Sequence, residues 1–179
     1  SGEKAGARDL VIGKFIDFYV KHSNVIPSEA LQPQYRATMK AAYPIHPELF
    51  DRLYQDWSTL ERFQRTRGVL RLMATVVHAL WVRGDTSALV MPATIPLEDT
   101  RVFEEITSHL DDPWKPVVDT DIAGGNSTAD TIDRDIPLLG KSMAAKRVAR
   151  VVFFGTAPMV NRNARTGVTG PVRGIEQKR

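Results

Sequence analysis

Four arginines within residues 62–71, RFQRTRGVLR, are the side chains of this sequence whose type and spacing could do chemistry. Arg67 lies where an apolar helical pattern begins. The first turn of a helix presents free backbone N–H groups and the positive end of the helix dipole, so a cation there costs about 0.3–1 kcal/mol. An anion would reverse that cost, because amides and a guanidinium together bind phosphate. The alternative is that these arginines pair with Glu61 or with an acidic segment elsewhere.

A second group of basic residues lies on the helical pattern KSMAAKRVARVVFFG, which starts at residue 141; its members are Lys141, Lys146, Arg147 and Arg150. Basic side chains on one helix face could contact nucleic-acid phosphates without reading sequence. Aromatic residues do not alternate with these basic residues, so the pattern does not favour stacking on the bases of a single strand. The alternative is that they dock on residues 98–135, which hold eleven acidic residues against three basic ones.

Other catalytic and metal-binding patterns are missing from the sequence. There is no cysteine, no serine in a G-x-S-x-G elbow and no metal-ligand spacing among the four histidines, His22, His46, His78 and His109. Gly140-Lys141-Ser142 is no phosphate loop, because the earlier glycine of that motif is replaced by Asp135. Asp130, Asp133 and Asp135 lack regular cation-ligand spacing. We therefore predict no catalytic residue and no metal site.

The elements that must position the arginines are helices. Apolar residues recur at helical spacing over residues 8–22, and Ser28 can cap a second helix that runs to about Ala42. Pro47 suits the first turn of a third helix, and the fourth runs from about residue 66 to Gly84. Residues 1–84 are therefore expected to form a helical, lid-like bundle of about four helices.

Residues 85–179 are expected to form a smaller α+β accessory domain. The pattern predicts strands within 87–93 and 114–122, a helix within 98–110, a loop over 123–137 and a basic helix over 141–155. From residue 156 the Gly, Pro and Asn content predicts a basic loop. The fold class is thus mainly α with a small α+β part.

Bulk properties fit an ordinary soluble chain. The 179 residues carry a formal net charge of +3, and no apolar stretch approaches the roughly 20 residues that span a membrane. We expect a cytoplasmic protein without membrane partners. The opening SGEKAGARDL has no initiator methionine, so we also expect the chain to be a piece of a longer protein.

The run AAYPIHPELFDRLYQDWSTLERFQRTRGVLRLMATVVHALW resembles a family of large predicted ATPases of the AAA+ type, described as a domain of unknown function. Its members are encoded beside DNA methyltransferases in prokaryotic restriction-like and anti-phage defence clusters. The similarity continues through LVMPATIPLED, LGKSMAAKRVARVVFFG and RGIE, so it covers nearly the whole chain.

The resemblance implies that a nucleotide-binding core lies upstream and binds ATP and Mg²⁺ in the intact protein, while this chain is a non-catalytic lid and an accessory domain. In lids of this type an arginine at a helix start reaches the γ-phosphate. Arg67 fits that position, with Arg65 and Arg71 as the fallbacks. The second part looks like the winged-helix modules that follow the lids of DNA-acting ATPases.

The leading hypothesis is therefore a regulatory fragment that senses nucleotide phosphate and couples it to the accessory domain. The implied partners are the upstream core, DNA and a DNA methyltransferase of the same cluster. Two alternatives stay open: a nucleic-acid-binding module that works without nucleotide, and a structural protein-interaction domain.

Overall fold

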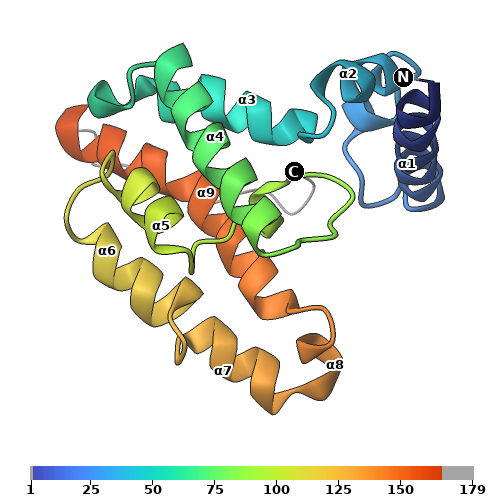
Figure 1. Cartoon of the computed structure of the whole chain (residues 1–179). Coiled ribbons are helices and arrows are strands. Elements are labelled where there is room, and N and C mark those ends of the chain that lie inside the picture. The colour runs from blue at the N-terminus through green and yellow to red at the C-terminus, as the bar shows by residue number, and fades with distance from the viewer. Residues whose placement is uncertain (1, 167–179) are drawn as a thin grey trace.

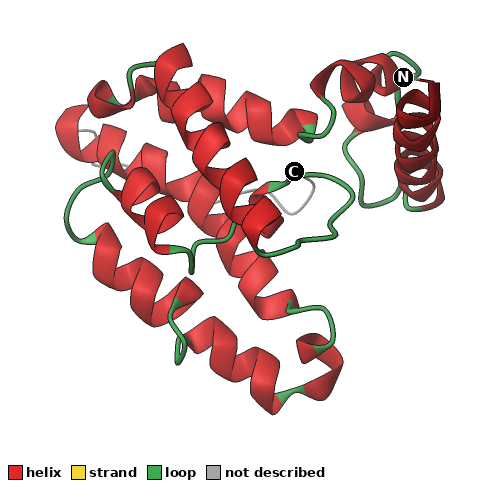
Figure 2. Cartoon of the chain, in the orientation of Figure 1, coloured by secondary structure: helices red, strands yellow, loops and turns green. Residues whose placement is uncertain are grey.

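The computed structural model describes residues 2–166 of the chain, and its side chains over residues 5–159. This part of the chain is mainly helical (Figures 1 and 2). The α-helices are α1 (Gly2–Lys21), α2 (Tyr35–Ala42), α3 (Pro47–Gln55), α4 (Thr66–Val82), α5 (Thr100–Thr107), α6 (Trp114–Val117), α7 (Thr128–Asp135), α8 (Pro137–Gly140) and α9 (Ala144–Thr166). Short 3-10 turns are η1 (Ser28–Leu31), η2 (Trp57–Thr59), η3 (Glu61–Phe63) and η4 (Pro92–Thr94), and η5 (Val118–Ala123) is a π-helix.

The predicted mainly helical fold class is confirmed, and the helices with strong apolar periodicity form where expected. Pro47 opens α3, whose first turn is capped by His46: the Nδ1 atom accepts from the backbone N–H of Glu48 at 3.1 Å. In α4 the apolar residues that recur at helical spacing in the sequence, from Val69 to Leu80, are the buried ones. Asp99 caps α5 by accepting from two backbone N–H groups.

The prediction of a second helix that runs from Ser28 to about Ala42 is wrong about where that helix begins. Ser28 begins only the 3-10 turn η1, and α2 starts at Tyr35. Pro33 lies between the two elements and cannot donate to a continuing helix, which explains the break.

Neither predicted strand forms within residues 2–166. In residues 87–93 the only pairing is one parallel bridge between Val90 and Ile45, because the neighbouring Pro92 starts the turn η4. Residues 114–122 form α6 and η5 instead. Val118 and Ile122 are four residues apart and both buried, so the apolar spacing in this segment is helical. The small β part is therefore not found in the described chain.

Two segments that we predicted as loops are helical. In the first, Ser127 caps α7, its Oγ accepting from the N–H of Asp130 at 3.2 Å. In the second, α9 continues past residue 156 to Thr166 with Pro158 inside it. Proline cannot donate to the carbonyl of Phe154, but the Nε1 of Trp57 donates to that oxygen at 2.9 Å. The predicted loop beyond Thr166 lies outside the described residues.

Two hydrophobic clusters hold the fold. The larger one takes fully buried side chains from both sides of residue 84, among them Leu53, Leu72, Val102 and Phe154, around the long diagonal helix α9 (Figure 1). The smaller one joins α1 and α2 through Ile12, Tyr19, Met39 and Leu89, beside the main body. The division at residue 84 is not visible as a break in the core, and it stays a prediction.

The described helices include none whose length and apolar character would let it cross a membrane.

Candidate functional site

The start of α4 is held by an unusual turn. Gln64 and Arg65 precede the helix with φ of +58° and +48°, values that non-glycine residues rarely adopt. A Cβ added to Gly68 would lie 1.6 Å from the carbonyl oxygen of Phe63. The chain over 61–65 therefore folds back tightly onto the first turn of α4, and only glycine fits at residue 68.

The sequence-predicted arginines are not equivalent in this arrangement. Arg65 and Arg67 are exposed, and neither has an acidic partner within the described residues. Arg65 stands at the N-cap position, and no side chain caps α4. The first turn of α4 therefore has no side-chain cap, and exposed arginines stand at its N-cap position and within the turn. This combination could hold an anion.

Arg71 behaves as the alternative interpretation expected, because it pairs with an acidic segment. Its Nε lies 2.7 Å from Oε1 of Glu105 on α5. The same carboxylate oxygen lies 3.2 Å from Nε2 of His109, whose buried ring packs edge-on against Phe63 at 4.9 Å. Arg71 therefore anchors α5 to α4 and is less available to a ligand than Arg67.

An exposed apolar stripe runs along α4 beside the basic residues. Leu70, Ala74, Val77 and Trp81 follow one another at intervals of three or four residues, and Trp81 is 84% exposed. That spacing places them on one helix face. An exposed apolar face of this kind is typical of a surface that contacts another protein.

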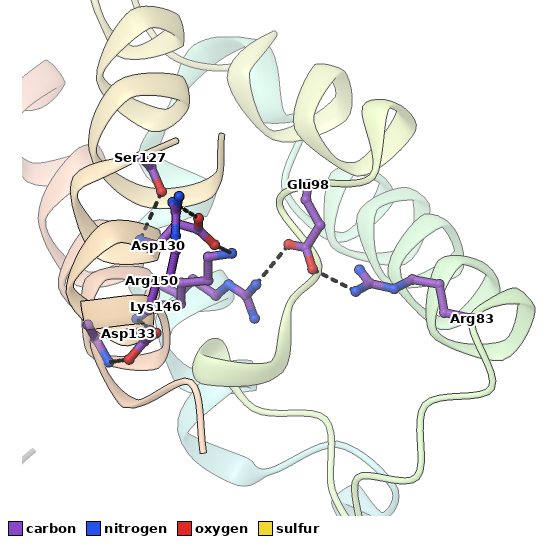
Figure 3. Close-up of polar contacts among 9 residues, drawn as sticks. Arg83, Glu98, Ser127, Asp130, Asp133, Lys146 and Arg150 are labelled. Atoms are coloured by element: carbon purple, nitrogen blue, oxygen red, sulfur yellow. Dashed lines mark hydrogen bonds and ion pairs between the residues drawn. The ribbon is translucent and has the colours of Figure 1, made fainter. Parts of the chain in front are cut away.

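The predicted basic helix corresponds to α9, but α9 begins at Ala144, so the predicted start at residue 141 is wrong and Lys141 lies just after α8. Of the three predicted basic residues on α9, two pair with acidic partners (Figure 3). Lys146 pairs with Asp130 of α7, which also accepts from Arg134. These hydrogen bonds hold the pKa of the Asp130 carboxyl below its ordinary value. The nearby Asp133 caps α9, accepting from the N–H groups of Ala145 at 2.9 Å and Lys146 at 3.1 Å.

Arg150 is almost fully buried. Its Nη2 lies 2.8 Å from Oε2 of Glu98, and its Nη1 donates to the carbonyl of Ala93 at 3.2 Å. Glu98 also pairs with Arg83, 2.7 Å away on the opposite side (Figure 3). Burial alone would raise the pKa of Glu98, but Arg150 and Arg83 outweigh it and hold the pKa below its ordinary value.

The two remaining basic residues differ from these. Lys141 is exposed and Arg147 half-buried, and neither has an ion pair within the described residues. The four residues predicted to contact nucleic acid therefore do not form one free basic stripe. Sequence reasoning also missed the Arg83–Glu98–Arg150 bridge, for which the only signal was the alternation of basic and acidic segments.

The model of one protein family, the DUF499 second domain, matches residues 20–168. No curated protein and no solved structure matches the chain.

Proposed function

The chain belongs to the DUF499 second domain family, and we propose that it is a non-catalytic regulatory domain that packs beside a nucleotide-holding domain and contacts the nucleotide phosphate with Arg67. The observation that carries this proposal is the pair Arg65 and Arg67. Both are exposed, without an acidic partner in the described chain, at a helix start that no side chain caps.

The local energetics support an anion at this place. A cation near the first turn of a helix is unfavourable by about 0.3–1 kcal/mol, and each strained residue with positive φ adds about 1–3 kcal/mol. Gln64 and Arg65 both carry such a conformation. A phosphate at the start of α4 would accept from the helix N–H groups and from the guanidinium groups, and so would offset the electrostatic cost.

The rest of α4 supports a neighbouring protein surface. The stripe of Leu70, Ala74, Val77 and Trp81 starts one turn after Arg67, so a domain that covers the stripe would reach the arginine. In the intact protein this neighbour would be the upstream core with its ATP and Mg²⁺, and the domain would act as its lid. Closure on ATP would then reach α5 through Arg71 and Glu105.

The nucleic-acid alternative has less support from the side chains of α9. Lys146 and Arg150 already pair with Asp130 and Glu98, so of the four residues predicted to contact nucleic acid, Lys141 and Arg147 are left to contact DNA phosphates. In the alternative of a protein-interaction domain, the same apolar stripe would contact a DNA methyltransferase.

The test is ATP hydrolysis by the intact parent protein carrying Arg67→Ala, with Arg65→Ala as a second variant. The matched control is Arg101→Ala, which removes an exposed arginine from the start of α5. Loss of a phosphate-contacting arginine should lower hydrolysis by about tenfold or more, from the 1.5–3 kcal/mol of a hydrogen bond to a charged group. Hydrolysis equal to that of the control would refute the role of Arg67.

A further inference from the structure

A small pocket lies at the other end of α4, between Arg83, the turn over 85–98 and the start of α9. Its free volume is about 50 Å³. A water molecule needs about 10–15 Å³ of free volume on this measure, so the pocket has room for a small group such as a phosphate.

The charges that line this pocket do not balance. Three arginines face two carboxylates: Arg83, Arg147 and Arg150 against Glu98 and Asp85. Glu98 is already shared by Arg83 and Arg150, and Asp85 accepts from the N–H of Ser87 at 2.8 Å. Arg147 is therefore left without a carboxylate within the described residues, and the pocket keeps an excess of positive charge.

Arg150 adds a polar atom that has no partner. Its side chain is only 6% exposed, and its Nε makes no hydrogen bond. A buried charged group with an unsatisfied donor is costly unless something completes it. Burial lowers the pKa of Arg150, and the nearby charges of Arg83 and Arg147 lower it further. The negative charge of Glu98 acts in the opposite direction but does not outweigh them. Because the Nε atom is itself closed off from solvent, a ligand in the pocket would offset the excess charge and would not pair with this atom.

We propose that the pocket lined by Arg83, Arg147 and Arg150 binds a small oxyanion, specifically a phosphate group. Arg147 would supply the free guanidinium, Arg83 and Arg150 would be shared between Glu98 and the ligand, and the hydroxyl of Ser87 would be within the lining to donate. The site is separate from that of Arg67, since the α4 rise of 1.5 Å per residue puts about 24 Å between residues 67 and 83. Disproof of this phosphate site would therefore leave the proposed role of Arg67 unaffected, and disproof of that role would leave this site unaffected.

The test is thermal unfolding and titration calorimetry of the 179-residue chain in sodium phosphate, with sodium chloride at equal ionic strength as the reference. At a tenfold excess over Kd, phosphate should raise the Tm by about 3–6 °C above the chloride value. Arg147→Gln should weaken phosphate binding by about tenfold or more and remove the shift. Arg134→Gln, which changes an exposed arginine outside the pocket, should keep it.

Arg147 is chosen because it is only half-buried and makes no ion pair in the described chain, so we expect Arg147→Gln to keep the fold. Adenosine monophosphate and adenosine separate the sources of the phosphate group. A shift with inorganic phosphate or with the monophosphate, lost in Arg147→Gln, supports the site. Equal Tm values in phosphate and chloride, a phosphate shift unchanged in Arg147→Gln, or a shift with adenosine itself would overturn it.

Discussion

The hydrogen bond from Trp57 to the carbonyl of Phe154 should be worth more than its geometry alone suggests. Pro158 lies four residues after Phe154 in α9, and it has no N–H to donate to that carbonyl. Trp57 is fully buried, and its Nε1 supplies the missing donor at 2.9 Å. Replacing Trp57 with Phe keeps an aromatic ring but leaves a buried acceptor without a partner.

The expected cost of Trp57→Phe is about 2–4 kcal/mol of unfolding free energy. Leaving a buried acceptor unsatisfied accounts for about 1–3 kcal/mol, and the smaller ring adds a cavity term. In a Pro158→Ala background the new backbone N–H can bond to Phe154 as in an ordinary helix. Trp57→Phe should then cost about 1–2 kcal/mol less, so the two substitutions should show coupling of that size.

The assay is urea denaturation followed by circular dichroism for the wild-type chain, the two single variants and the double variant. Trp81→Phe is the control, because Trp81 is exposed on α4 and its loss should change stability by less than about 0.5 kcal/mol. If Trp57→Phe costs the same with proline or alanine at residue 158, the indole does not substitute for the missing helical donor and the reasoning is wrong.

Two further predictions concern the turn before α4 and the buried ion pairs. Gly68→Ala should lower the unfolding free energy measured by urea denaturation by at least about 2 kcal/mol, because the added Cβ would clash with the Phe63 carbonyl. Gly125 has open space around it, so the control Gly125→Ala should change stability little. Similar losses of stability in the two variants would contradict the tight turn. Glu98→Gln should cost about 1–2 kcal/mol at pH 7, a figure reduced because about a third of the Glu98 side chain is exposed. The pKa of Glu98 is lower in the folded state than in the unfolded state, so its stabilisation is complete above the ordinary value of 4.5 and disappears as the pH falls through the lower folded value. A difference in unfolding free energy between wild type and Glu98→Gln that stays constant as the pH falls would contradict this.

The sequence predicted the helices whose buried face repeats strongly. In α4 the buried residues recur at helical spacing over the whole element, and Pro47 marks the start of α3. It failed where few apolar residues carry the pattern. The segment of α6 and η5 buries Val118 and Ile122 beside two aspartates and one threonine, and α7 buries only Ala129 and the capping Asp133. The extension of α9 could not be predicted either, because it depends on a distant donor, Trp57.

The candidate site shows the same division between local and tertiary information. That Arg67 begins a helix follows from the neighbouring residues, and the structure places it there, exposed. Which basic residues remain free does not follow from the sequence. Arg150 meets Glu98 and Lys146 meets Asp130 only because α9 packs against η4 and α7. One alternative from the sequence was that the basic residues dock on the acidic segment 98–135. For Lys146 and Arg150, the ion pairs in the structure agree with that alternative.

The most direct measurement for the proposed function is hydrogen–deuterium exchange of the intact parent protein, with and without ATP, followed in peptides that cover residues 62–72. We predict that ATP slows exchange of the first backbone amides of α4, and that Arg67→Ala removes this protection while Arg101→Ala keeps it. Exchange over residues 62–72 that ATP leaves unchanged, or that ATP slows equally in Arg67→Ala, would contradict a phosphate contact at the start of α4.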